Sequence, residues 1–379
     1  IHMKRKTKGM LAAAAALMCI FVASGCGKSG GGSDAANPAS SGSGETAAQN
    51  SKSDTGAEEI VEYYLGGPRT DLLTNKGNVY YLGEKGSLKS DDKKVTTPTK
   101  YLENIKSLIT ISTYIDNNLD LYLGGIDVVK GGILKEPKKL GSNIVQVEGS
   151  NIGFLALDKD GNLYSFGKKG YSGSNNDEVY AELTKVDGIK DVVKIGSNGV
   201  SNDGYLALTK DGTVYAKRFD GPFTKLMENV KDIQGVYITD KDDVVYVWDE
   251  FTKDKVTKIA KSLQISWGGS SDYVWFIENN TIAPYNSKGE PIRMDEDVKH
   301  LFSYYPKDIK KIYIYEDKTD KKDNKTKNLK MVYENTNGEI VLYAVSNSHS
   351  DKGKVEVNTK VTKSLDDAVK VWEFVKDSK

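Results

Sequence analysis

Cysteine is nearly absent from this chain, which has two in 379 residues. Cys19 lies inside an apolar run near the start, and Cys26 follows that run. If the run is removed on export, a single cysteine remains, which excludes an internal disulfide and a cysteine-based metal site. The folded part must then be stabilised by a packed core, and a region of this length can build one.

Histidine is also scarce, since only His300 and His349 lie beyond the first residues of the chain. Neither a Ser/His/Asp triad nor a zinc-binding histidine pair can be assembled from them. We therefore predict no catalytic residue, no metal and no cofactor. A calcium loop beginning at Asp158 is the alternative, but its twelfth position is Lys169 where an EF-hand has glutamate.

Neither sign of charge predominates, because 53 basic residues face 53 acidic ones. Residues 4–8 supply four of the basic residues and precede the apolar run, so the rest of the chain is slightly acidic. Binding to nucleic acid depends on an excess of Lys and Arg. The composition therefore excludes nucleic acid as a partner.

The first 25 residues have the order of an export signal, after an Ile1-His2 remnant of a tag. Basic residues precede the apolar run Met10–Val22, which is shorter than the roughly 20 residues needed to span a membrane. Ala23-Ser24-Gly25 then leads into Cys26. This order resembles a bacterial lipoprotein signal, which implies cleavage before Cys26 and a lipid on its sulfur. The alternatives are an ordinary signal peptide or a transmembrane helix.

The lipoprotein resemblance implies an address as well as an anchor. It predicts a secreted chain held at the outer face of the cytoplasmic membrane, on a Gram-positive-type cell surface. Residues 26–57 are rich in Gly and Ser and have almost nothing apolar to bury, so we predict a lipidated, disordered tether. A flexible tether of this length spans about 30 Å.

Residues 58–379 contain a recurring hairpin pattern. Phe154–Tyr164 reads FLALDKDGNLY, Tyr205–Tyr215 reads YLALTKDGTVY, and weaker copies lie before and after them. Each copy has two β-type runs around a short turn of Gly, Asn or Asp, residues that accept the positive φ of tight hairpins. A short strand ending at small residues precedes most copies, as in Ile189–Ser197, and suits a site where backbones approach closely.

The spacing of the pattern predicts the architecture. Tyrosines that follow the turns, from Tyr80 to Tyr343, recur at intervals of about 44 residues. A unit of this length with three or four strands is typical of one propeller blade. We therefore predict that residues 58–379 form an all-β, seven-bladed β-propeller. Six or eight blades are the alternatives because the intervals are unequal, and one or two β-sandwiches are a further alternative.

The same residues carry a family resemblance. Residues 144–216 combine a strand ending in Gly with the Leu-Ala-Leu-Thr-Lys-Asp-Gly-Thr-Val-Tyr type of hairpin, and this resembles the regulator of chromosome condensation repeat. The resemblance implies a seven-bladed propeller. The Gly-Gln-Leu-Gly loop of that family is missing, and nothing in the chain supports its exchange activity toward a small GTPase.

The C-terminal segment is open to two interpretations. Ser364–Phe374 begins with an approximate helix-capping box, but it also resembles the strand sequence at Lys190–Ile195. We favour the strand, which would complete a sheet with residues near 59–65 and join the chain ends.

Aromatic residues supply the only candidate binding set. Trp267, Trp275, Tyr304 and Tyr305 would form a recognition patch if the loops of one propeller face bring them together, because aromatics dominate binding hot spots. The alternative is burial of these side chains between blades.

These features together favour a binding role over a catalytic one. We predict a lipid-anchored, cell-surface protein, a monomeric propeller whose face recognises an envelope protein or glycan. The alternatives are an extracellular enzyme that acts on surface glycans from a central pocket, and a structural subunit of an envelope assembly.

Overall fold

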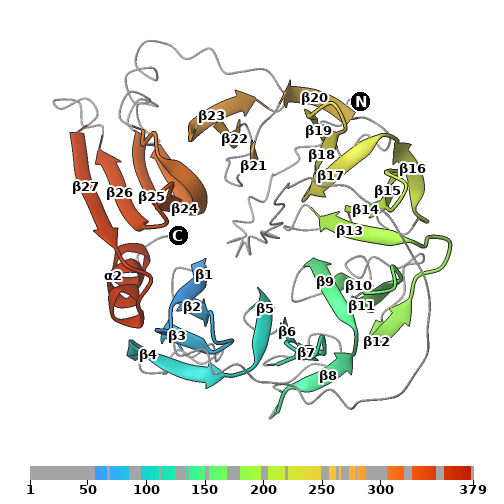
Figure 1. Cartoon of the computed structure of the whole chain (residues 1–379), viewed down its shortest axis with the longest axis horizontal. Coiled ribbons are helices and arrows are strands. Elements are labelled where there is room, and N and C mark those ends of the chain that lie inside the picture. Colours follow the sequence, from blue (N-terminus) through green and yellow to red (C-terminus); the bar gives the residue numbers. More distant parts are fainter. Residues whose placement is uncertain are drawn as a thin grey trace, which may run out of the picture.

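The computed structural model describes residues 56–376 with gaps (Figure 1). The residues within this range that it does not describe are 66–68, 85–94, 111–112, 125–133, 135, 150–152, 169–179, 198–203, 218–220, 249–255, 262–263, 266–272, 279, 287–304, 320–326 and 347–353. The predicted signal peptide and most of the predicted tether, Cys26 included, lie outside the described residues. No helix in the described part is long and apolar enough to cross a membrane.

The described chain consists of strands with one helix at its end. The elements in chain order are β1 (Ile60–Leu65), β2 (Arg69–Thr74), β3 (Val79–Gly83), β4 (Val95–Leu102), β5 (Ile105–Thr110), β6 (Thr113–Asp116), β7 (Leu121–Leu123), β8 (Lys138–Gly141), β9 (Ile144–Gly149), β10 (Gly153–Asp158), β11 (Leu163–Gly167), β12 (Tyr180–Lys185), β13 (Val192–Ser197), β14 (Tyr205–Thr209), β15 (Val214–Lys217), β16 (Thr224–Met227), β17 (Val230–Gln234), β18 (Tyr237–Asp240), β19 (Val244–Trp248), β20 (Val256–Lys261), β21 (Gln264–Ile265), β22 (Tyr273–Glu278), β23 (Thr281–Asn286), β24 (Ile309–Thr319), β25 (Lys327–Asn335), β26 (Ile340–Ser346), β27 (Lys354–Val361) and α2 (Leu365–Val375).

The strands form antiparallel sheets that follow chain order. The sheets stand around a common axis, and the first strand of each lies nearest the centre (Figure 1). The predicted all-β propeller is therefore confirmed. Six sheets are complete four-stranded blades, and a three-stranded sheet, β21–β23, precedes the last of them in the chain. The sequence predicted seven blades, with six or eight as alternatives. The described residues show six complete blades, and the described part of the remaining unit has three strands.

One hydrogen-bonded turn explains why the repeat is visible in the sequence. In the β10–β11 hairpin, the Asp158 carboxylate accepts the backbone N–H groups of Asp160 and Asn162 at 2.9 and 2.8 Å. The hydroxyl of Tyr164 donates to the same carboxylate at 3.1 Å. Gly161 closes the turn with a φ of +82°. The Asp, Gly and Tyr of the motif therefore hold one turn.

The turns also join neighbouring blades. The carbonyl of Gly161 accepts the N–H of Val192 at 3.1 Å, at the first residue of the next inner strand. The same bond recurs around the ring, from Ile105 to Gly77, from Ile144 to Leu119, from Val230 to Gly212 and from Ile309 to Asn280. These turns and the first residues of the inner strands therefore lie on one side of the propeller, which we call the turn face.

Small residues stand where inner strands meet, as the sequence predicts. A Cβ atom on Gly196 would lie 2.3 Å from the carbonyl oxygen of Gly235 on the neighbouring blade. A Cβ atom on Gly149, the last residue of inner strand β9, would lie 2.6 Å from the oxygen of Gly153 on the next strand of the same blade. Side chains fit at neither position, because backbone atoms cannot move aside as the end of a side chain can.

The C-terminal segment is a helix, so the prediction of a strand was wrong. Ser364 caps it by accepting the N–H of Asp367 at 3.2 Å. Buried residues then recur at helical spacing, at Ala368, Val371, Trp372 and Val375. A short apolar run does not by itself distinguish a strand from a helix. The likeness of this segment to the strand sequence at Lys190–Ile195 was therefore not enough to predict a strand.

Helix α2 takes over the closing role that the sequence assigned to a strand. The first blade uses only β1–β4 and the last only β24–β27, so no sheet combines the two chain ends. Instead, α2 packs against β1, β3 and β4, and β1 lies beside β24 (Figure 1). The N–H of Ile60 also donates to the carbonyl of Lys363 at 2.8 Å. The two ends of the described chain therefore meet through helix α2, with this backbone hydrogen bond beside it.

Candidate functional site

Exposed apolar side chains recur at one position of the repeat. Val61, Val145 and Val193 are 48%, 39% and 54% exposed, and each is the second residue of an inner strand. Among the described residues, Val355 on β27 is the only other exposed large apolar side chain. Recurrence at one structural position separates these valines from the scattered apolar side chains that any protein surface carries.

A β-bulge at each of these positions explains the exposure. The pairing of β1 with β2 shifts between Ile60 and Glu62, and that of β13 with β14 shifts between Val192 and Lys194. The skipped residue is left out of the ladder, and its side chain is redirected. Equivalent bulges occur on the other complete blades, and together the skipped residues form what we call the bulge ring: Val61, Lys106, Val145, Val193, Lys231 and Lys310.

Polar residues follow the bulge and link neighbouring inner strands. The Lys311 ammonium contacts both oxygens of Glu62 at 2.7 Å, and that of Lys194 contacts Asp232 at 2.7 Å. The side-chain amide of Gln146 bonds both the N–H and the carbonyl of Ile195, at 3.0 and 2.7 Å. Beneath the bulge ring, the blades are therefore fastened by charge and amide pairs.

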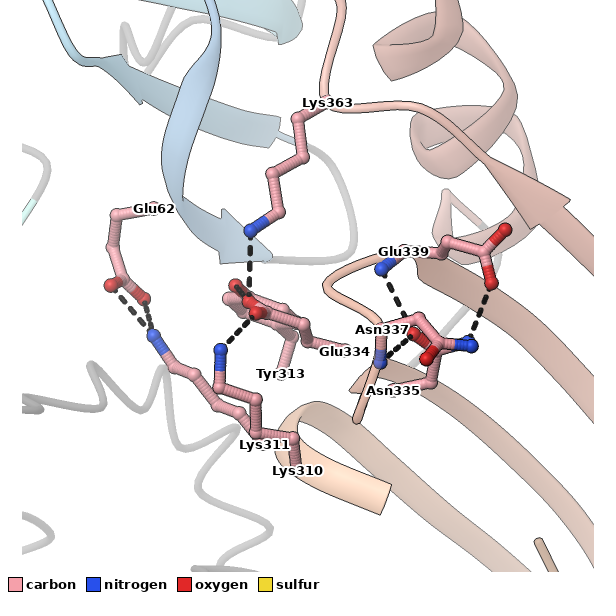
Figure 2. Close-up of polar contacts among 9 residues, drawn as sticks. All are labelled: Glu62, Lys310, Lys311, Tyr313, Glu334, Asn335, Asn337, Glu339 and Lys363. Atoms are coloured by element: carbon pink, nitrogen blue, oxygen red, sulfur yellow. Dashed lines mark hydrogen bonds and ion pairs between the residues drawn. The ribbon is translucent and has the colours of Figure 1, made fainter. Parts of the chain in front are cut away.

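The densest polar cluster lies where the last blade meets the first (Figure 2). Glu334 accepts Lys310 at 2.7 Å, Lys363 at 3.1 Å and the hydroxyl of Tyr313 at 3.2 Å. Burial acts to raise the pKa of Glu334, but the bonds from Lys310 and Lys363 lower it below its usual value. Burial raises the pKa of Glu62, although Lys311 acts in the opposite direction. Each carboxylate has its own lysine, so the cluster joins blades and is not arranged as an acid–base pair.

A different carboxylate, Glu148, has only uncharged donors. Gln146 donates to one of its oxygens at 3.0 Å, and Ser197 donates to the other at 3.3 Å. The side chain is partly buried on β9. Burial raises the pKa of Glu148 to about 7, and the two hydrogen bonds and the charge of Lys194 only partly offset that effect.

The four aromatics predicted from the sequence are described only in part. Trp267 and Tyr304 lie outside the described residues. Trp275 lies on β22, where its backbone pairs with Pro284. Tyr305 is buried in one apolar cluster with Ile277 and Ile309. Their assembly into a patch stays a prediction. No group of three or more His, Cys, Asp or Glu in the described part could hold a metal.

The bulge ring was missed by reasoning from the sequence, although the sequence carries a signal for it. A half-buried strand alternates apolar and polar residues. The inner strands instead begin with an apolar pair, Ile60-Val61, Ile144-Val145 and Val192-Val193. Two consecutive apolar residues at the start of a half-buried strand are the mark of a bulge here, and the second of them is exposed.

Comparisons with known proteins give similarity of fold only. No family model and no curated protein matches the chain. Among solved structures, yeast RCC1 (Prp20) bound to Kap60 is 16% identical, with 64% of this chain and 76% of that chain covered and a TM-score of 0.44. Human WBSCR16 is 13% identical, covers 78% and 80%, and has a TM-score of 0.39. Hsv2 of Kluyveromyces lactis is 11% identical, covers 81% and 100%, and has a TM-score of 0.44.

The first of these structures bears the name of the repeat family that residues 144–216 resemble. This structure and the other two share little sequence identity with the chain, and their TM-scores are below 0.5. The propeller is therefore established by the chain's own sheets, and Kap60 is a partner of the yeast protein.

Proposed function

We propose that this chain is a lipid-anchored binding protein of the cell surface, and that its turn face recognises an envelope protein. The observation that carries the proposal is the bulge ring, in which three exposed valines, Val61, Val145 and Val193, stand around the propeller axis together with three lysines. Valine methyl groups cannot hydrogen-bond the hydroxyls of a glycan, so the ring fits a protein better than a sugar. Two of the three lysines already pair with carboxylates of this chain, Lys231 with Asp243 and Lys310 with Glu334, both at 2.7 Å, so the proposal rests on the three valines.

The architecture adds to this proposal. We propose that β21–β23 is the seventh blade, because Asn280 has the positive φ of the other turns and its carbonyl accepts the N–H of Ile309 as they do. The bulge ring then has one residue from each of the other six blades. The aromatic set of Trp267, Trp275, Tyr304 and Tyr305 stays a second proposed contact.

The point at which the chain enters the propeller relates the anchor to the binding face. Residues 56–59 lead into β1 at the turn face, where Glu59 bonds the backbone and the side chain of Asn75. A tether from Cys26 would therefore attach at the turn face. With a span of about 30 Å, it leaves room for a partner between this face and the membrane.

The anchor is tested by Cys26→Ala. We expect the variant to be released into the medium or to remain unprocessed, because the sulfur that would carry the lipid is missing. Membrane and medium fractions are compared by immunoblotting, with Cys19→Ala as the matched control. Equal membrane retention of wild type and Cys26→Ala would contradict the anchor.

The binding face is tested by Val145→Glu combined with Val193→Glu. The charges should abolish an apolar contact, so cross-linking of the full chain to its envelope partner in intact cells should fall at least about tenfold. Val355→Glu is the matched control, since Val355 is a comparably exposed valine on an outer strand. Circular dichroism checks that all variants fold. Unchanged cross-linking in the double variant, or equal loss in the control, would overturn the proposed face.

A further inference from the structure

The acidic residues of the inner strands differ in how their charge is balanced. Glu62 and Asp232 each lie 2.7 Å from a lysine on an adjacent inner strand. Glu148 has no ion pair among the described residues; it is the fifth residue of β9, two positions further along its inner strand than Glu62 and Asp232 are along theirs. The cation whose charge acts on its pKa, Lys194, is paired with Asp232.

Neutral neighbours hold the Glu148 carboxylate in a fixed position. Gln146 donates to Oε1 and Ser197 donates to Oε2, so both oxygens are oriented from β9 and from β13. The amide of Gln146 is itself held by the backbone of Ile195. Each carboxylate oxygen can accept a second hydrogen bond beyond the one it already has. The group is therefore positioned in advance with acceptor capacity to spare.

The environment also makes an added cation favourable. Removing a carboxylate from water without a counter-charge is costly, and the raised pKa of Glu148, about 7, is the sign of that cost. Glu148 is a half-buried residue, so part of its surface meets solvent. β9 and β13 are the innermost strands of their blades, next to the propeller axis (Figure 1).

We propose that Glu148 is a receptor for a cationic side chain, a lysine or an arginine, that the protein partner inserts along the propeller axis. This inference rests on the proposed binding function and adds a chemical requirement to it. The partner's ammonium or guanidinium group would form charge-assisted hydrogen bonds with the carboxylate. Lys194 and Asp232 remain paired with each other beside it.

A small probe tests the receptor without the partner. Nα-acetyl-lysine amide is titrated against the full chain, and Nα-acetyl-norleucine amide, which lacks the charge, is the control. The readout is the side-chain carboxyl ¹³C resonance of Glu148, assigned by its absence in Glu148→Gln. The lysine probe should lower the pH midpoint of this resonance, because it binds the ionised form, and its binding should weaken as the pH falls below about 7. The titrations of Asp232 and Glu62 serve as internal references. Equal behaviour of the two probes would overturn the receptor.

The matched variants are Glu148→Gln and Glu62→Gln. Glutamine keeps one acceptor oxygen for Gln146, and its NH2 group can donate to the Ser197 hydroxyl, but it removes the charge, so the first variant should weaken binding of the lysine probe at least about tenfold. Glu62→Gln removes a carboxylate that already has a lysine, and it should leave probe binding unchanged.

The same variants separate this inference from the proposed function. If the Val145/Val193 double variant abolishes cross-linking to the partner while Glu148→Gln preserves it, the turn face stands and the cation receptor is refuted. If neither variant changes cross-linking, the proposed function itself fails. Loss of cross-linking in both, together with selective binding of the lysine probe, supports both proposals.

Discussion

Replacing Trp372 with alanine should lower the free energy of unfolding by about 3–5 kcal/mol, the usual cost of truncating a large buried aromatic side chain. Trp372 is 4% exposed, and its apolar cluster contains Ile60 of β1 and Val332 of β25. The indole therefore fills the joint between the two ends of the chain. Because no strand is shared across this joint, the helix must supply much of the apolar contact that closes the ring.

The matched control is Glu373→Ala on the same helix. Glu373 is exposed, and its contact with Lys376 is an ion pair at 3.7 Å, so the change should stay within about 0.5 kcal/mol. Unfolding in urea monitored by circular dichroism measures both variants. Equal stability of the two would show that α2 does not close the propeller.

Gly161→Val should cost about 2–4 kcal/mol, from the strain of a positive φ together with a steric clash. Gly161 has a φ of +82°, and a Cβ atom there would lie 3.0 Å from both the N and the O of Val192. Its own carbonyl also bonds Val192, so the substitution strains a hairpin and the junction with the next blade at the same point.

Gly188→Val separates the two causes. Gly188 has nearly the same φ, +85°, but no heavy atom lies within 4 Å of its Cβ position. Its substitution should show the conformational strain alone, about 1–3 kcal/mol. Thermal unfolding of the two variants gives the difference. If Gly188→Val costs as much as Gly161→Val, the contact between turn and next blade contributes nothing measurable.

The hairpins could be predicted from the sequence because their determinants are local. The Asp, Gly and Tyr of the repeat bond one another within seven residues, as Asp158, Gly161 and Tyr164 do, so the pattern survives in a single sequence. The pattern predicts the antiparallel strand pairs, and its spacing predicts that they form a propeller. The blade count does not follow from the spacing, because the units differ in length.

The closure of the ring could not be predicted in the same way. Whether Ser364–Phe374 forms a strand or a helix depends on whether a free sheet edge is available to it. The first blade fills its own four positions with β1–β4, so the segment instead buries Trp372 and Val371 as a helix against that blade. The apolar spacing and the serine cap were visible in the sequence, but the completed sheet was not.

The candidate site was the least predictable part. The sequence directed attention to aromatic residues, of which Tyr305 is buried in an apolar cluster. The bulge ring depends on register, since a one-residue shift decides which side chain points outward. The unpaired charge of Glu148 depends on Lys194 bonding Asp232 on the next blade, and no local pattern records a contact between blades.

The central claim is that sheets from opposite ends of the chain stand side by side in a closed ring. Zero-length carbodiimide cross-linking of the full chain tests it directly, because Glu62 and Lys311 are 249 positions apart and their side chains meet at 2.7 Å. We predict that mass spectrometry recovers the Glu62–Lys311 cross-link. It should also recover the Lys194–Asp232 cross-link, whose ammonium nitrogen and carboxylate oxygen also lie 2.7 Å apart. Recovery of Lys194–Asp232 without Glu62–Lys311 would contradict the closed ring.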